Sequence, residues 1–119
     1  MAVKSSLPIE AIRHTERSFQ SAIVELAGYC GWHVNHALPA QIRPGVWRTH
    51  VMGDTGFPDL VLAHPKRGVI FAEVKTIRGR LTNGQKSWLD ALKAGGAEAY
   101  CWRPEDWAFI KYRLGATGA

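Results

Sequence analysis

The chain is poor in cysteine and has no long apolar run. Its 119 residues contain only Cys30 and Cys101, too few for a disulfide scaffold, so we expect both thiols to be free. The N-terminus does not resemble a secretory leader, and no apolar stretch approaches the about 20 residues that a membrane helix needs. These absences argue against a secreted or membrane protein, and we expect the chain in the cytoplasm.

Acidic residues are also scarce relative to basic ones. There are 10 Asp and Glu against 15 Lys and Arg, a net charge of +5. Such an excess on a small domain favours a polyanionic partner such as nucleic acid, although charge alone fits equally well with a surface that only aids solubility. The length suits one domain with its own core, so we expect residues 1–119 to form a single unit with 1–14 as a loose lead-in.

The periodicity of apolar residues predicts three helices and four strands. The expected helices are 16–30, 83–94 and a last one beginning near Pro104, and the expected strands are 32–37, 60–63, 69–75 and 98–102. This α-β-β-β-α-β-α order predicts an α/β fold, with a mixed sheet of about four strands flanked by helices. Residues 38–56, rich in proline and glycine, are expected to form a long mobile loop that either contacts a substrate or simply connects elements.

Three charged residues stand out in the two central strands. Asp59 opens the first of them, and Glu73 and Lys75 sit near the end of the second. Residues two apart on a strand share a face, so Glu73 and Lys75 point the same way and Val74 points the other way. In an antiparallel hairpin Asp59 lies beside them. A surface salt bridge is the simpler interpretation of a Glu-x-Lys pair, but charged residues on such apolar strands favour a functional site.

Two carboxylates and an ammonium at one place suit phosphodiester hydrolysis. Hard divalent cations prefer oxygen ligands, and one or two carboxylates suffice to hold Mg²⁺ beside a phosphate. The metal makes bound water more acidic, and a nearby lysine orients or deprotonates that water or stabilises the phosphorus centre. The sequence contains no glycine-rich phosphate loop of the common types, which disfavours a metabolic enzyme acting on a small phosphorylated substrate.

The wider pattern resembles a known family. Pro58-Asp59, thirteen residues, then Glu73-Val74-Lys75 is similar to the signature of the PD-(D/E)xK nuclease superfamily. With Gly56-Phe57 before it and Gly79-Arg80-Leu81-Thr82 and Trp102-Arg103-Pro104 after it, the run resembles the virus-type replication-repair nuclease (VRR-NUC) family over about residues 16–114. The resemblance implies a restriction-endonuclease-like fold.

The resemblance also implies roles for individual residues. Asp59, Glu73 and the carbonyl of Val74 would bind Mg²⁺ or Mn²⁺, and Lys75 matches the catalytic lysine. Glu16 matches a further metal-site glutamate of the family, but a carboxylate at a helix start also favours the helix dipole. Gln85 matches a catalytic glutamine, but three residues after Thr82 it also fits a capping box.

Basic residues around these motifs are candidate DNA contacts. They are Arg43 and Arg48 in the long loop and Arg78, Arg80 and Lys86 after the motif. An ordinary basic surface is the alternative for all of them. A zinc site built on Cys30, His33 and His36 is disfavoured because no fourth ligand is evident.

We therefore predict a metal-dependent DNA endonuclease. Compact stand-alone members of the family, found in phages and bacteria, resemble Holliday-junction resolvases, which implies a branched or flapped DNA substrate and a homodimer. The alternative is a nucleic-acid-binding module without cleavage activity. It would bind DNA with a strong salt dependence and yield no products with any metal.

Overall fold

The computed structural model describes residues 15–36, 40–48 and 53–116, and the predicted lead-in 1–14 lies outside these ranges. The elements in chain order are α2 (Glu16–Tyr29), β1 (His33–His36), β2 (Ala40–Arg43), β3 (Val46–Arg48), β4 (Leu60–His64), β5 (Gly68–Val74), α3 (Asn83–Ala94), β6 (Glu98–Trp102), the 3₁₀ turn η2 (Pro104–Asp106) and α4 (Trp107–Leu114). The predicted helices and the four predicted strands are confirmed to within one or two residues at most ends.

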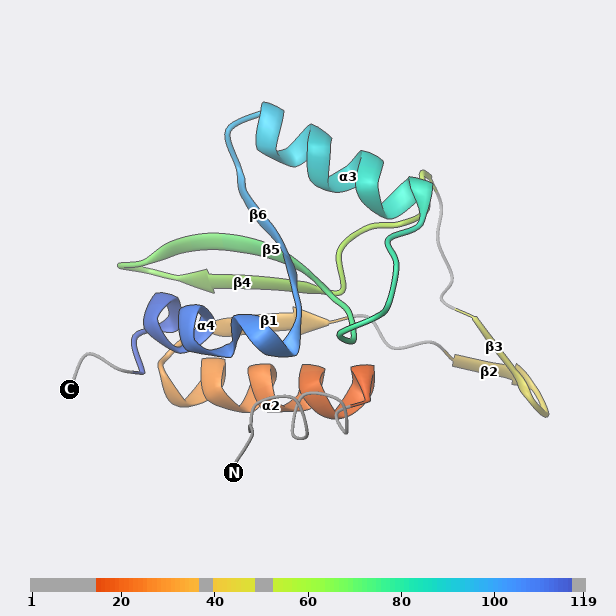
Figure 1. Cartoon of the computed structure of the whole chain (residues 1–119), viewed down its shortest axis with the longest axis horizontal. Coiled ribbons are helices and arrows are strands. Elements are labelled where there is room, and N and C mark those ends of the chain that lie inside the picture. Colours follow the sequence, from red (N-terminus) through yellow and green to blue (C-terminus); the bar gives the residue numbers. More distant parts are fainter. Residues whose placement is uncertain (1–14, 37–39, 49–52, 117–119) are drawn as a thin grey trace, which may run out of the picture.

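A four-stranded mixed sheet forms the centre of the molecule, in the order β1-β4-β5-β6 (Figure 1). β4 pairs antiparallel with both β1 and β5, whereas β6 runs parallel to β5. The tight turn at 65–67 makes β4 and β5 a hairpin, as the turn residues after Ala63 predicted. The predicted α/β fold of restriction-endonuclease-like type is confirmed.

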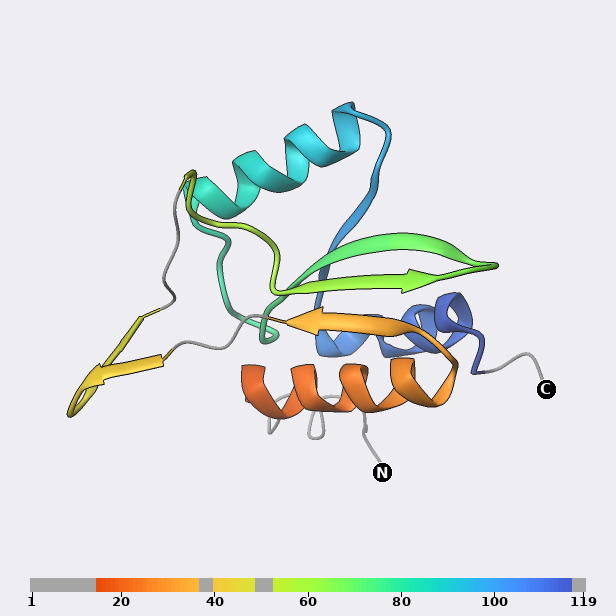
Figure 2. The ribbon, with the colours of Figure 1, turned by 180° about the vertical axis from the view of Figure 1, so that it is seen from behind.

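The helices cover the sheet from two sides. α2 and α4 contact each other, and α2 also contacts β1 and β5. α3 packs along β6 and lies on the side of the molecule opposite α2, which both views show (Figures 1 and 2). None of the helices in the described part of the chain has the length and apolar character that crossing a membrane requires.

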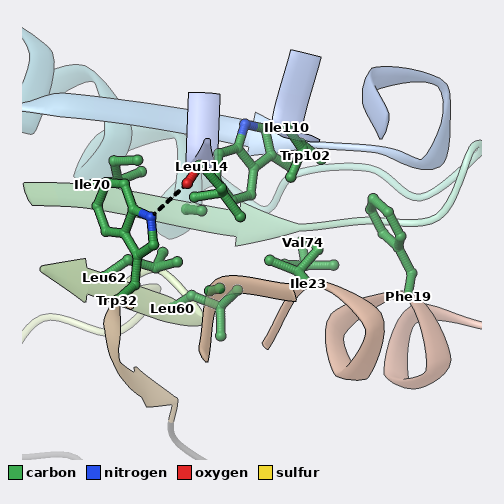
Figure 3. Close-up of a cluster of buried hydrophobic side chains, with 12 residues drawn as sticks. Phe19, Ile23, Trp32, Leu60, Leu62, Ile70, Val74, Trp102, Ile110 and Leu114 are labelled. Carbon is green, nitrogen blue, oxygen red and sulfur yellow. Dashed lines mark hydrogen bonds between the residues drawn. The ribbon is translucent and has the colours of Figure 1, made fainter. Parts of the chain in front are cut away.

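The hydrophobic core lies between the sheet and the pair α2 and α4 (Figure 3). Alternate residues of β4 and β5 point into it, since Leu60, Leu62 and Ile70 are fully buried. Trp32 closes one end of this core, and its indole N–H donates to the carbonyl of Leu114 at 3.1 Å. The other members of this buried cluster are Phe19, Ile23, Ala27, Ala72, Val74, Trp102 and Ile110.

The prediction of a loop without regular structure over 38–56 was wrong for part of that range. Strands β2 and β3 form a small antiparallel hairpin, with an irregular register between Gln41 and Arg43. Its turn is Pro44-Gly45, and Gly45 has a φ of 78°, a conformation that glycine adopts without strain. Turn residues followed by Val46-Trp47 are typical of a hairpin. The prediction of a loop gave more weight to the high proline and glycine content of the whole segment. The hairpin extends away from the main sheet (Figure 1).

Candidate active site

Asp59 and Glu73 meet at one end of the central hairpin. Leu60 pairs with Ala72 in the antiparallel register, so the residue before β4 lies opposite the end of β5. The main-chain N–H of Val74 donates to Oδ2 of Asp59 at 2.9 Å, which fixes the aspartate against β5. The predicted convergence is confirmed, and it follows from strand register alone.

Glu73 and Lys75 share the face of β5 opposite the core. Val74, between them, is buried in the core cluster, as the alternation predicted. Glu73 is 1% exposed and Lys75 is 9% exposed, and Lys75 Nζ lies 3.7 Å from Glu73 Oε2. A solvated surface salt bridge is therefore excluded, because both partners are buried. A buried ion pair contributes little to stability after the cost of desolvation, so its retention favours a functional role.

Glu73 is buried beside the half-buried Asp59, and its charged form is disfavoured there. The pKa of Glu73 is raised from 4.5 to about 8. Burial is the largest cause, the charge of Asp59 and a hydrogen bond with it also raise the pKa, and Lys75 acts in the opposite direction. Oε1 of Glu73 is buried and has no hydrogen-bond partner among the residues that the structure describes. Two adjacent carboxylates, one with an unused oxygen, are an arrangement that a hard divalent cation relieves.

Glu16 approaches the same end of the sheet from the first turn of α2, whose start lies beside the end of β5 in both views (Figures 1 and 2). Burial raises its pKa, Lys75 lowers it and Asp59 raises it, so Glu16 is within electrostatic range of both groups. In the described residues no three His, Cys, Asp or Glu side chains converge as a metal site. Asp59 and Glu73 thus form the centre of the candidate site, and Glu16 lies near them without joining them in one cluster.

The comparison with protein families identifies this arrangement. A family model described as the VRR-NUC domain matches residues 33–103, more than half of the chain. The chain belongs to the VRR-NUC domain family. Membership implies a nuclease-type function with nucleic acid as the substrate, and the matched range contains Asp59, Glu73 and Lys75 but not Glu16. Neither the curated proteins nor the solved structures contain a match to this chain at the similarity required.

Gln85 of this VRR-NUC domain caps a helix. Its Oε1 accepts a hydrogen bond from the main-chain N–H of Thr82 at 2.9 Å, and Thr82 Oγ1 accepts one from the N–H of Gln85 at 3.1 Å. The predicted capping box is confirmed, and the catalytic role of Gln85 stays a prediction. The start of α3 also touches the segment that leads to Asp59, because Gly56 lies directly against the backbone of Gly84.

The candidate DNA-binding residues lie on exposed parts of the domain. Arg78 and Arg80 are exposed in the segment after Lys75. Lys86 is exposed on α3 and pairs with Asp90 at 3.4 Å, a surface ion pair of small energetic value. Arg43 is exposed at the end of β2.

Of the last candidate DNA contact, Arg48, the structure describes only the backbone. Arg48 ends β3, and its side chain lies outside the described residues.

Sequence reasoning assigned no role to Arg103. Its Nη1 donates to the carbonyl oxygens of Thr76 at 2.7 Å and Gly79 at 2.6 Å, on the segment that follows Lys75. The parallel pairing of β5 with β6, which places Val74 opposite Trp102, brings Arg103 to this end of the sheet. The position of this arginine, directly after a predicted strand and before a proline, could be seen in the sequence. The sequence did not show that this strand pairs with β5, so it did not indicate which residues the arginine contacts.

Proposed function

We propose that this VRR-NUC domain is a metal-dependent DNA endonuclease of the PD-(D/E)xK type. The observation that carries the proposal is the buried Glu73 beside the half-buried Asp59. Among the described residues Glu73 Oε1 has no hydrogen-bond partner, and the Lys75 ammonium lies 3.7 Å from Glu73 Oε2. A non-cleaving nucleic-acid-binding module would have no use for a buried, destabilising glutamate beside a second carboxylate and a lysine.

The donor set fits Mg²⁺ or Mn²⁺. Oxygen atoms of Asp59 and Glu73 and the carbonyl of Val74 would hold the ion, with Glu16 contributing directly or through water. The positive charge would offset the burial and the repulsion from Asp59 that raise the pKa of Glu73, and would so favour the ionised form of Glu73. When bound, the ion supplies Lewis-acid polarisation of the phosphate and a more acidic water.

The side chains then divide the remaining work. Water attacks the phosphorus in line, the bond to the 3′ oxygen breaks, and that oxygen gains a proton. Lys75 orients the attacking water or stabilises the negative charge that develops on the phosphate oxygens. Its burial strengthens this interaction, because water screens it less than at the surface. Gln85, with its carbonyl oxygen already used for capping, has its amide N–H₂ group left for positioning.

Several finer features of the substrate follow from the family resemblance. We propose branched or flapped DNA, as for Holliday-junction resolvases, cut by a homodimer with two active sites in replication, repair or recombination. The exposed residues Arg43, Arg78 and Arg80, together with Arg48 and Lys86, would neutralise backbone phosphates.

A cleavage assay with a matched lysine control tests the proposal. End-labelled duplex, single-stranded, flapped and four-way-junction DNA would be incubated with Mg²⁺, Mn²⁺ or EDTA. Lys75→Met keeps the apolar stem in its buried site and removes only the ammonium. Lys66→Met makes the same change at the exposed turn between β4 and β5, at the far end of the hairpin.

We expect metal-dependent products, with Lys75→Met slowed by about 10²- to 10⁴-fold and Lys66→Met close to the wild type. The preferred substrate would identify the role in DNA metabolism. Tight DNA binding without products in either metal would refute the catalytic proposal and favour the binding module.

A further inference from the structure

The segment after Lys75 forms a turn that lies against the lysine side chain. The N–H of Gly79 donates to the carbonyl of Thr76 at 3.3 Å, which closes the turn. A Cβ on Gly79 would stand 3.0 Å from Thr76 Oγ1 and 3.4 Å from Lys75 Cδ. The backbone of Gly79 therefore limits where the lysine stem can go, and a shift of this turn moves or frees Lys75.

Arg103 holds this turn from the neighbouring strand. One guanidinium nitrogen, Nη1, donates to the carbonyls of both Thr76 and Gly79, at 2.7 and 2.6 Å. These two carbonyls are the first and last of the turn, so one cationic group joins its ends. Hydrogen bonds from charged donors are shorter and stronger than neutral ones, so the two bonds from Arg103 hold the turn firmly.

Arg103 is itself held at its main chain. Its N–H donates to Asp106 Oδ2 at 2.9 Å, and the N–H of Asp106 donates back to the Arg103 carbonyl at 2.8 Å. The preceding residue, Trp102, is 1% exposed, and its carbonyl accepts the N–H of Lys75 at 3.0 Å. The end of β6 thus restrains Lys75 in two ways. Trp102 accepts the main-chain N–H of Lys75, and Arg103 binds the turn that follows Lys75.

We propose that Arg103 is a positioning residue for Lys75. By closing the 76–79 turn against the lysine stem, it keeps the Lys75 ammonium next to Glu73 and the reacting phosphate. Its effect on cleavage rests on the nuclease function proposed above, but its effect on the turn does not. A displacement of about 1 Å in a catalytic group lowers rates by as much as about 10²-fold, which sets the scale expected for loss of this support.

A direct contact between Arg103 and a DNA phosphate is the competing explanation. A phosphate ligand would contribute to the salt dependence of binding, and its loss would reduce the log-log slope by about 0.9 on duplex DNA. A positioning residue whose guanidinium is engaged with main-chain carbonyls would leave that slope unchanged and lower kcat.

The test compares Arg103→Ala and Arg103→Lys with a matched control. Arg113→Ala is the control, because the Arg113 guanidinium also donates to a main-chain carbonyl, that of Arg67 at 2.7 Å, at the other end of the hairpin. Hydrogen exchange of the backbone amides would be measured for each full-length protein without DNA or metal. The same proteins would be assayed for kcat of DNA cleavage and for the salt dependence of DNA binding.

We expect Arg103→Ala to raise exchange at the Lys75 and Gly79 amides by about 10-fold or more, with distant amides unaffected. Its kcat should fall by about 10- to 100-fold with an unchanged salt slope. Arg103→Lys should recover part of both losses, because an ammonium can also donate to two carbonyls. Arg113→Ala should leave exchange in the turn and kcat close to the wild type.

Unchanged exchange at 75–79 in Arg103→Ala would overturn the proposal, and a reduced salt slope with unchanged exchange would instead assign Arg103 to phosphate binding. Equal exchange increases in Arg113→Ala would also overturn it, since the effect would then be general destabilisation. A wild-type protein that does not cleave DNA under any condition would defeat the nuclease function, while the exchange data would still decide whether Arg103 holds the turn.

Discussion

Replacing Glu73 by glutamine is expected to stabilise the metal-free protein against unfolding, and to do so increasingly as pH rises. Glutamine keeps the shape of the side chain and removes a charge that burial and Asp59 both disfavour. The same change removes a proposed metal ligand, so it should have the opposite effect when a divalent cation is present.

The size and pH range follow from linkage. The pKa of Glu73 is about 8 in the folded protein and near 4.5 when unfolded, so the folded state holds a proton that the unfolded chain releases between these values. The protonated carboxyl group contributes its full stability below the unfolded pKa, and that contribution is lost as pH rises through the folded pKa. One proton corresponds to a slope of at most about 1.4 kcal/mol per pH unit, or an upper limit of about 5 kcal/mol over this range.

Urea unfolding of the wild type and Glu73→Gln in EDTA, from about pH 5 to about pH 9, measures this effect. The difference between the two proteins cancels the other titrating groups. We expect it to be smallest near pH 5, to grow in favour of Glu73→Gln, and to level off above about pH 8.

Repeating the titration with excess Mg²⁺ or Mn²⁺ tests the metal site independently of catalysis. The wild type should gain about 2.7 kcal/mol at a metal concentration near 100 times its Kd, and Glu73→Gln should gain much less. A stability difference that does not change with pH in EDTA would refute the electrostatic reasoning. An equal metal effect on both proteins would refute Glu73 as a ligand.

Two further predictions concern stability away from the carboxylate pair. Gly56→Ala should lower the free energy of unfolding by about 2–4 kcal/mol in calorimetry, because φ is 98° and a Cβ would overlap the backbone of Gly84; a neutral result would show that this approach is not tight. Glu98→Gln should cost about 1 kcal/mol at neutral pH, since hydrogen bonds from Arg113 hold the pKa of Glu98 below its usual 4.5. That stability is present above pH about 4.5 and is lost as pH falls through the lowered pKa of Glu98. The free energies of unfolding of the two proteins, measured by denaturant titration, should therefore converge in acid. A difference between them that does not change with pH would contradict this role of Glu98.

Local patterns in the sequence were sufficient for most elements and for the centre of the site. The Thr82 capping box predicted where α3 begins, a continuous apolar run predicted β4, and apolar alternation predicted β5. The proximity of Asp59 and Glu73 could be predicted because a tight turn between two neighbouring strands sets the register of those strands. Where local signals conflicted, as at Pro44-Gly45 between β2 and β3, composition alone pointed to the wrong structure.

Contacts between distant segments were decided only by the tertiary structure. The sequence indicated that Glu73 and Lys75 share a face, but their burial, which raises the pKa of Glu73, depends on how the helices and loops cover the sheet. The placement of Glu16 depends on how α2 packs under the strands. Arg103 reaches the turn after Lys75 because β6 pairs parallel with β5, a connection made through α3 that no local pattern specifies. Register within a hairpin is a short-range property of the chain, whereas burial and parallel pairing arise from the packing of the whole domain.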